Sequence, residues 1–356
     1  SLGFPRPANL LFLYLLGFYL LLISLNIDYR IAALGAFAYA FSSYFFIIIQ
    51  AGHMTKAHAI AYLPMVVAAV LYTYRGKMLL GGALTALAVA LQIFSNHYQI
   101  TYYLLLVLII IGFSQLHKDF KSNNLASFFK RSGVLIFAAL LAAGTSFTRL
   151  KTTLDYGKET TRGKSELTNN LDNKTQGLDK DYATQWSYGV AESMTLLIPN
   201  FYGGSSVNSV LSIEGSETLD FLRKFKNKKL ANSLAQFKSS SYWGEQPIVS
   251  GPTYLGAIVI FLFVLGIFFV NNRLRTWILL ATIMSLMLAW GKNFMPLTEF
   301  FLDYFPAYNK FRAVSMILII AEFTVPLLAF VALDKFLNSD SNKREAFLKN
   351  AFYITC

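Results

Sequence analysis

The chain lacks most of what stabilises a soluble protein in water. It has one cysteine among 356 residues, Cys356, which excludes an intrachain disulfide and any metal site built from several cysteines. Only 14% of its residues are charged, whereas soluble domains carry about 25%. Hydrophobic residues make up 55% and aromatic residues 16% of the chain, an excess that a water-soluble core does not absorb. The composition therefore indicates a protein embedded in a membrane.

The hydrophobic residues are grouped in long runs that contain few or no charges. An α-helix needs about 20 apolar residues to cross the hydrocarbon core of a bilayer, so these runs predict transmembrane helices. The predicted fold class is an all-α polytopic membrane protein with about nine transmembrane helices. The predicted helices lie near residues 9–26, 31–49, 57–74, 78–95, 98–115, 131–148, 251–271, 274–290 and 312–334.

Three regions follow from this pattern: residues 1–148 with six helices, 149–250 as a large polar loop or lid, and 251–356 with three helices and the start of a further apolar segment. Within the loop, residues 152–181 have too few large apolar side chains for a core and predict a loosely ordered stretch. Aromatic residues within 182–204 favour a short helix at the membrane interface, ended by Pro199. The pattern at 217–237 predicts a basic amphipathic helix, which lies on anionic lipid or forms one face of a soluble lid.

Lysine and arginine residues predict the orientation, because basic residues near helix ends are retained in the cytoplasm. One set of alternate connections holds thirteen of them and the other set's short segments hold five, so the first set is assigned to the cytoplasm. The outer side then collects residues 1–8, 50–57, 95–98, 149–250 and 291–312. The net charge of +12 is explained by these anchors, and with no soluble basic domain we expect no nucleic-acid binding.

Histidines are concentrated on the predicted outer side. Three of the four, His53, His58 and His97, lie there together with Lys56. Lys56 and the histidines would form an anion-binding mouth, although a solvated loop that caps the next helix fits the same residues. His53 and His58 are five residues apart and so do not share a helix face, which means that the spacing does not indicate a divalent metal. The cofactor requirement stays open.

Polar residues at the start of the fifth predicted helix form a second cluster. Asn96, His97 and Gln99 have the side chains that bind sugar or phosphate, and ordinary turn chemistry is the alternative. A third cluster places Glu192 and Glu245 among aromatic residues. Carboxylates beside aromatic rings are typical of carbohydrate sites, so both are candidates for the catalytic base; an aromatic belt with incidental charges is the alternative.

Basic residues at the start of the ninth predicted helix are unusual for their side. Lys310 and Arg312 lie where the charge count expects few basic residues, so we consider a lipid phosphate or pyrophosphate as their ligand. Snorkelling to lipid headgroups explains them equally well. Glu322 lies ten residues deeper in the apolar run, where an ionisable group is expected to be functional or paired.

Five of these segments, in order along the chain, resemble the YfhO family of bacterial multi-pass membrane proteins. They are AGHMTKAHAIAYLPM (51–65), SNHYQITYYLLL (95–106), LLIPNFYGG (196–204), YWGEQPIVSGPTYLGA (242–257) and YNKFRAVSM (308–316). The resemblance implies a glycosyltransferase of GT-C type in the bacterial cytoplasmic membrane, acting on its outer side. Such an enzyme takes a sugar from a polyprenyl-phosphate donor in the lipid bilayer and transfers it to a cell-envelope glycan or protein acceptor.

The resemblance also implies where the catalytic carboxylate belongs. In GT-C enzymes it lies in the first outer loop, after the first span, and this chain is expected to begin beyond that point, so that the fragment itself would be inactive. By resemblance, the supporting residues for donor phosphate and sugar are His53, Lys56, His58, His97, Glu192, Glu245 and Arg312. Gln99 and Lys310 are added to the substrate-binding candidates from the residue pattern itself, and the base lies in the missing loop or is Glu192 or Glu245. Two rival hypotheses remain: a transporter or flippase of an anionic lipid or solute, and a non-catalytic scaffold of envelope assembly.

Overall fold

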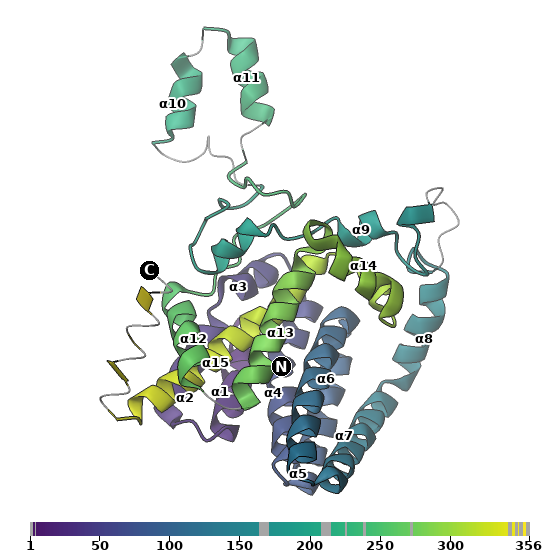
Figure 1. Cartoon of the computed structure of the whole chain (residues 1–356). Coiled ribbons are helices and arrows are strands. Elements are labelled where there is room, and N and C mark those ends of the chain that lie inside the picture. The colour runs from purple at the N-terminus through teal and green to yellow at the C-terminus, as the bar shows by residue number, and fades with distance from the viewer. Residues whose placement is uncertain are drawn as a thin grey trace.

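The structure is a computed structural model that describes residue 3, residues 5–163, 171–207, 215–224, 226–237, 240–270 and 273–340, and residues 344, 345, 348, 352 and 353. Within this part the regular elements are helices, and one isolated bridge joins Gly203 to Tyr242 (Figure 1). The first half contains α1 (Ala8–Ser24), α2 (Tyr29–Ala40), α3 (Ser43–Gln50), α4 (Met54–Tyr74), α5 (Met78–Phe94), α6 (Tyr98–Lys121), α7 (Leu125–Thr145) and α8 (Phe147–Lys158).

The second half begins with short elements and ends with long apolar helices. The short elements are η1 (Leu171–Asn173), α9 (Lys180–Thr184), η2 (Ala191–Leu196), α10 (Glu217–Lys224) and α11 (Lys228–Phe237). They are followed by α12 (Ala257–Phe269), α13 (Arg273–Ala289), η4 (Gly291–Phe294), α14 (Met295–Tyr304), η5 (Tyr308–Lys310), η6 (Val314–Leu318) and α15 (Ile319–Leu337).

Helix length and composition support a protein embedded in a membrane. Four helical stretches in the described part are long and apolar enough to cross: α4, α6, α7 and Val314–Leu337. The number rises to six if two bent pairs each count as one span, namely α2 with α3, bent by 46°, and α13 with Gly291–Tyr304, bent by 113°. The shorter apolar helices α1, α5 and α12 coincide with three more of the predicted segments. Nine crossings would require these short helices to span as well.

Residues in the left-handed backbone conformation end several of the helices. Asn26, Asn96 and Asn123 follow α1, α5 and α6 with φ near +62°, +61° and +51°, and Gly76 follows α4 with φ +98°. Asparagine and glycine are the residue types that adopt this conformation readily, and it closes the last helical turn. The chain therefore reverses direction within a few residues, and α4 packs against both α5 and α6.

The core is centred on α15, which is buried at every position from Ile319 to Ala332. A helix that is hydrophobic all round belongs in the middle of a bundle. Aromatic rings pack against it: Phe18 stacks on Tyr39 with ring centroids 4.5 Å apart, and Phe323 meets both rings edge-on. In contrast, α7 exposes Ile136, Phe137 and Leu140 by 62 to 66%. Such an apolar outer face fits contact with lipid.

The connections lie at two opposite ends of the bundle. We call the described residues of 43–54, 94–99, 147–256 and 290–314 the loop end, because long-range bonds join them: Ser43 to Pro252, Arg149 to Phe94, and Gln99 to Arg312. We call the described residues of 24–30, 74–78, 115–131 and 273–275 the turn end, where Arg75 bonds Ser24 and Arg273 bonds Gln115. The loop end thus holds the polar clusters of the sequence.

The polar loop differs from its prediction in three places. Helix α8 continues from the membrane region to Lys158, with none of its described side chains buried, so the prediction of a loosely ordered stretch from residue 152 was wrong for 152–158. In place of an interfacial helix ended by Pro199 there is a short 3-10 helix, η2. The single amphipathic helix at 217–237 is two helices, α10 and α11, which project from the bundle as a pair (Figure 1). Residues 164–170, Phe225, Lys343, Lys349 and Cys356 lie outside the described residues.

Candidate functional site

Three of the predicted basic residues come together at the loop end. His53 precedes α4, Lys56 lies in its first turn, and His97 precedes α6, which packs against α4. The charges are close enough for Lys56 and His53 to act on His97 electrostatically. Lys56 is only 8% exposed, and no carboxylate forms an ion pair with it in the described part of the chain. A buried cation without a counter-charge is costly, so this cluster fits an anion.

His97 is held as a neutral hydrogen-bond donor. Its Nδ1 lies 3.4 Å from the backbone N–H of Ile100, which assigns the ring proton to Nε2. The pKa of His97 is lowered from 6.5 to about 4, mainly by burial and then by the positive charge of Lys56. The pKa of His53 is also lowered, first by partial burial of its ring and then by the positive charge of Lys56. At neutral pH the ring of His97 therefore offers an N–H to an anion without adding to the uncompensated charge.

The lowered pKa of His97 predicts an acid-sensitive contribution to stability. A histidine whose pKa falls from 6.5 unfolded to about 4 folded takes up its proton preferentially in the unfolded state between these values. We therefore expect the stability that depends on His97 to be complete above pH 6.5 and to decline as pH falls towards 4. Thermal unfolding in detergent, measured from pH 4 to 7.5, should decline less steeply for His97→Gln than for the wild type. Equal slopes would contradict this assignment.

His58 differs from the other two histidines in its hydrogen bonding. Its Nδ1 is 2.8 Å from the carbonyl oxygen of Met54, one turn earlier in α4, so its ring is tied to its own helix. Within the described residues no group of three or more His, Cys, Asp or Glu side chains is placed to hold a metal ion. The predicted site residues that converge are therefore His53, Lys56 and His97, with His58 beside them.

Gln99 and Arg312 link the start of α6 to the polar loop. The Gln99 amide donates to the carbonyl oxygen of Arg312 at 2.7 Å and to the Tyr103 hydroxyl at 2.8 Å. The Arg312 guanidinium donates to the Tyr182 hydroxyl at 2.7 Å and lies 5.8 and 5.9 Å from the ring centres of Tyr182 and Trp186. The Arg312 backbone is thus fixed beside the start of α6, while its exposed guanidinium is held by Tyr182 and Trp186.

The Lys310 side chain is bonded to backbone carbonyl oxygens of the polar loop. Its ammonium donates to the carbonyl oxygens of Arg162 and Gln176 at 2.8 and 2.5 Å, and its own carbonyl accepts from Arg162 Nε at 3.0 Å. Burial lowers its pKa. In this conformation Lys310 joins two parts of the polar loop, so a role in phosphate binding would require these bonds to break.

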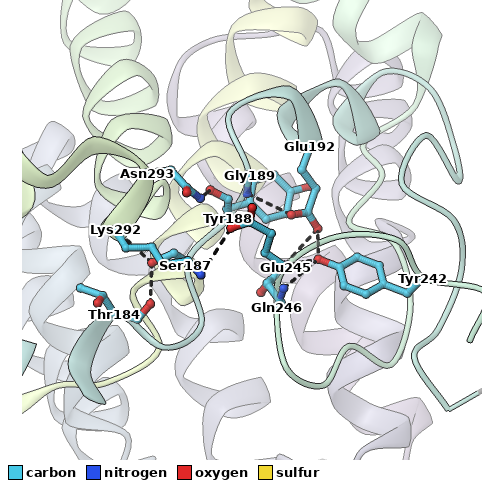
Figure 2. A network of polar contacts seen from close by, with 10 residues as sticks. All are labelled: Thr184, Ser187, Tyr188, Gly189, Glu192, Tyr242, Glu245, Gln246, Lys292 and Asn293. Carbon is cyan, nitrogen blue, oxygen red and sulfur yellow. Dashed lines mark hydrogen bonds and ion pairs between the residues drawn. The ribbon is translucent and has the colours of Figure 1, made fainter. Parts of the chain in front are cut away.

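Glu192 is the centre of a closed polar network (Figure 2). The Tyr242 hydroxyl and the Gln246 amide donate to its Oε1 at 2.8 and 3.0 Å, and the backbone N–H of Gly189 donates to Oε2 at 2.9 Å. Burial raises the pKa of Tyr242, and the negative charge of Glu192 raises it further. With three donors and 4% exposure, the carboxylate holds η2 against the segment 242–246.

The cavity beside Glu192 is too small for a sugar. Its volume is about 20 Å³, which is room for about one water molecule, and it is lined by Tyr188, Thr195, Tyr202, Tyr242 and Gln246 among others. Glu245 belongs to the same polar network but has a different partner: it is exposed and lies 3.3 Å from Lys292 Nζ (Figure 2). Glu245 does not line the small cavity beside Glu192.

Comparisons with known proteins add no further constraint. No family model, no curated protein and no solved structure matches this chain. The contacts at the loop end are therefore what a functional proposal has to explain.

Several residues of the loop end were not predicted from the sequence. Ser187 Oγ accepts from the Lys292 backbone N–H at 2.8 Å and donates to the Thr184 carbonyl at 2.6 Å, so it joins α9 to η4 (Figure 2). Trp290 donates to Ser193 Oγ at 2.9 Å. Tyr182 and Trp186 were noted only as interfacial aromatics, although they hold Arg312. A lone serine or tyrosine in a polar loop has no spacing or pattern that marks such a partner.

Proposed function

We propose that the protein is a bacterial membrane glycosyltransferase of GT-C type, related to the YfhO family, with nine transmembrane helices and the loop end on the outer side of the cytoplasmic membrane. It would transfer a sugar from a polyprenyl-phosphate donor to a cell-envelope acceptor. The observation that carries the proposal is the convergence of Lys56, His53 and His97 at one end of an apolar bundle, where no carboxylate of the described residues forms an ion pair with Lys56.

The chemistry of the proposed transfer explains why these residue types are useful. When the bond between sugar and phosphate breaks, negative charge grows on the leaving phosphate. A cation that is shielded from water stabilises this charge more strongly than an exposed one, and it needs no reorganisation. Lys56 supplies that charge, and the neutral His97 supplies an N–H donor. Arg312, whose backbone is fixed beside the start of α6, would contribute a fork of donors to the same phosphate.

The acceptor hydroxyl also needs a base, and neither candidate is poised for that role here. Glu192 already accepts three hydrogen bonds, and Glu245 is exposed and paired with Lys292. A carboxylate that already accepts several hydrogen bonds has fewer free lone pairs with which to accept a proton from a hydroxyl. We therefore assign Glu192 to loop positioning and expect the base on another segment, as the resemblance to GT-C enzymes implies.

A transfer assay tests the proposal directly. Membranes from cells that produce the full-length protein are incubated with a polyprenyl-phosphate sugar that is radiolabelled in the sugar. We expect label to move into envelope material, and membranes without the protein serve as the control. The proposal fails if no donor sugar is transferred and deletion leaves the envelope glycans unchanged.

One observation favours transport as a second candidate. Glu322 is fully buried in α15, and its Oε2 accepts from the hydroxyl of Ser42, which lies in the break between α2 and α3. Its Oε1 has no hydrogen-bond partner in the described part of the chain. Ionisable residues beside broken helices are typical of transporters. Solute flux into liposomes that Glu322→Gln abolishes, together with absence of sugar transfer, would favour this function.

A further inference from the structure

The turn end contains a second group of converging cations, far along the bundle from the loop end. Arg75 follows α4, Arg131 lies in α7, and Arg273 begins α13. Arg273 interacts electrostatically with Arg75, Arg131 and Asp119. Arg131 and Arg273 thus lie near the carboxylate of Asp119 in α6, and Arg75 lies close enough to act on Arg273.

The carboxylate of this group is buried and itself held in place. Asp119 is 3% exposed, and its Oδ2 accepts from the Gln115 amide at 2.7 Å, one turn earlier in α6. Arg131 Nη1 lies 3.9 Å from the same oxygen. The other carboxylate of the turn end is Asp28, whose backbone N–H donates to Asp334 Oδ1 at 3.0 Å, and no ion pair in the described residues joins Asp28 or Asp334 to the three arginines. Three positive charges thus face one negative charge.

Each guanidinium is anchored by one nitrogen. Nη1 of Arg75 donates to the Ser24 carbonyl, Nη1 of Arg131 to the Tyr74 carbonyl at 3.0 Å, and Nη1 of Arg273 to the Gln115 side-chain oxygen. These described bonds all use Nη1. Because a guanidinium group is planar, each bond also fixes the direction in which the other nitrogens of that group point. Oriented arginine forks match the oxygens of a phosphate group.

Other basic residues at the turn end, of the kind that fix the orientation of a membrane protein, are placed differently from the three arginines. Lys118 and Lys121, on the last turns of α6, are exposed and lie away from the core, as expected of side chains that reach towards lipid headgroups. Arg131 is turned inward, with a side chain only 21% exposed and its head over Asp119. Arg273 is half-buried, and Arg75, although exposed, is held by the carbonyl oxygen of Ser24. Anchoring alone does not require this convergence.

We propose that Arg75, Arg131 and Arg273 form a binding site for a phosphate group at the turn end, as carried by the headgroup of an anionic phospholipid. Asp119 and Gln115 position the arginines and do not touch the ligand. Binding would offset the surplus positive charge and join α4, α7 and α13 at this end of the bundle. The site is distinct from the loop-end cluster of His53, Lys56 and His97.

The test measures lipid binding to the full-length protein purified in a neutral detergent. Native mass spectrometry is used to titrate phosphatidylglycerol and, separately, phosphatidylcholine. We expect wild-type protein to prefer phosphatidylglycerol, and Arg75→Gln with Arg273→Gln to weaken that binding by about tenfold or more, because two charge-assisted hydrogen-bond donors are lost. The matched control, Lys118→Gln with Lys121→Gln, removes the same charge at the same end and should bind as the wild type does.

Further measurements distinguish lipid phosphate from free phosphate and control for misfolding of the variants. Displacement of phosphatidylglycerol by inorganic phosphate would identify free phosphate as a ligand of the same site, and its failure to compete would identify the lipid. Arg273→Lys keeps the charge without the fork and should give an intermediate affinity, so it tests the site even if the double variant does not fold. Equal binding of the two lipids, or equal losses in the arginine and lysine variants, would overturn the proposal.

Discussion

Replacing Lys56 by glutamine is expected to lower the rate of sugar transfer by about 100-fold or more while leaving the fold intact. The magnitude is that of removing one preorganised group that stabilises charge in a transition state. The effect should appear in the turnover rate at saturating donor, because the charge on phosphate grows as the bond breaks. The measurement is the transfer assay with membranes containing equal amounts of wild-type and variant full-length protein.

The same substitution is expected to leave the stability of the fold unchanged or to raise it, although it lowers the transfer rate. Lys56 is 8% exposed and has no carboxylate partner in the described structure, so its charge costs free energy of folding. Lys56→Gln should therefore leave the melting temperature unchanged or raise it. Lys158→Gln is the control, since Lys158 is exposed at the loop end, 3.4 Å from Asp155, and should affect neither quantity. If Lys56→Gln lost activity only in proportion to a lower melting temperature, Lys56 would be structural.

Substituting valine for Gly291 is expected to detach the polar loop from the bundle. Gly291 has φ +48°, and a Cβ atom there would lie 2.1 Å from Ser187 Oγ and 2.5 Å from Val314 Cγ2. Left-handed backbone strain and overpacking each cost about 1–3 kcal/mol for such a residue. Since Ser187 joins α9 to η4, the clash breaks the contact that places the loop.

Limited proteolysis and thermal unfolding measure this effect. Gly291→Val should expose residues 180–207 to cleavage, lower the melting temperature and abolish transfer. Gly157→Val is the matched control, because a Cβ at Gly157 in α8 meets nothing within 4 Å, and it should behave as the wild type does. If the loop of Gly291→Val stayed as protected from cleavage as that of the wild type, Ser187 and Val314 would be able to move aside without loss of stability.

The positions of the apolar helices could be predicted because the hydrocarbon core imposes a length and a composition on them. Each predicted span coincides with an apolar helix, although the break at Ser42 and the bend after α13 are not visible in hydropathy. Ser42 resembles any small polar residue within an apolar run. Its role depends on Glu322, 280 residues later, and no local pattern encodes that contact.

The candidate site was predictable in its residue types but not in their partners. The grouping of His53, Lys56 and His97 followed from helices that alternate in direction, which places successive connections at opposite ends. The binding of Lys310 to the Arg162 and Gln176 carbonyls did not follow, because it depends on how the polar loop folds back. Glu192 was noted for its aromatic neighbours, yet it is closed by Tyr242 and Gln246, which are 50 and 54 residues away.

The three-residue links from α4 to α5 and from α5 to α6 have a consequence for how a ligand would enter. Such short links prevent α4 and α6 from sliding past one another, so the spacing of Lys56 and His97 stays constant whether the site is empty or full. The opposite side is held by contacts between Arg312 and the rings of Tyr182 and Trp186. A movement that admits a ligand is therefore expected to begin where the guanidinium leaves these rings, while α4 and α6 keep their places.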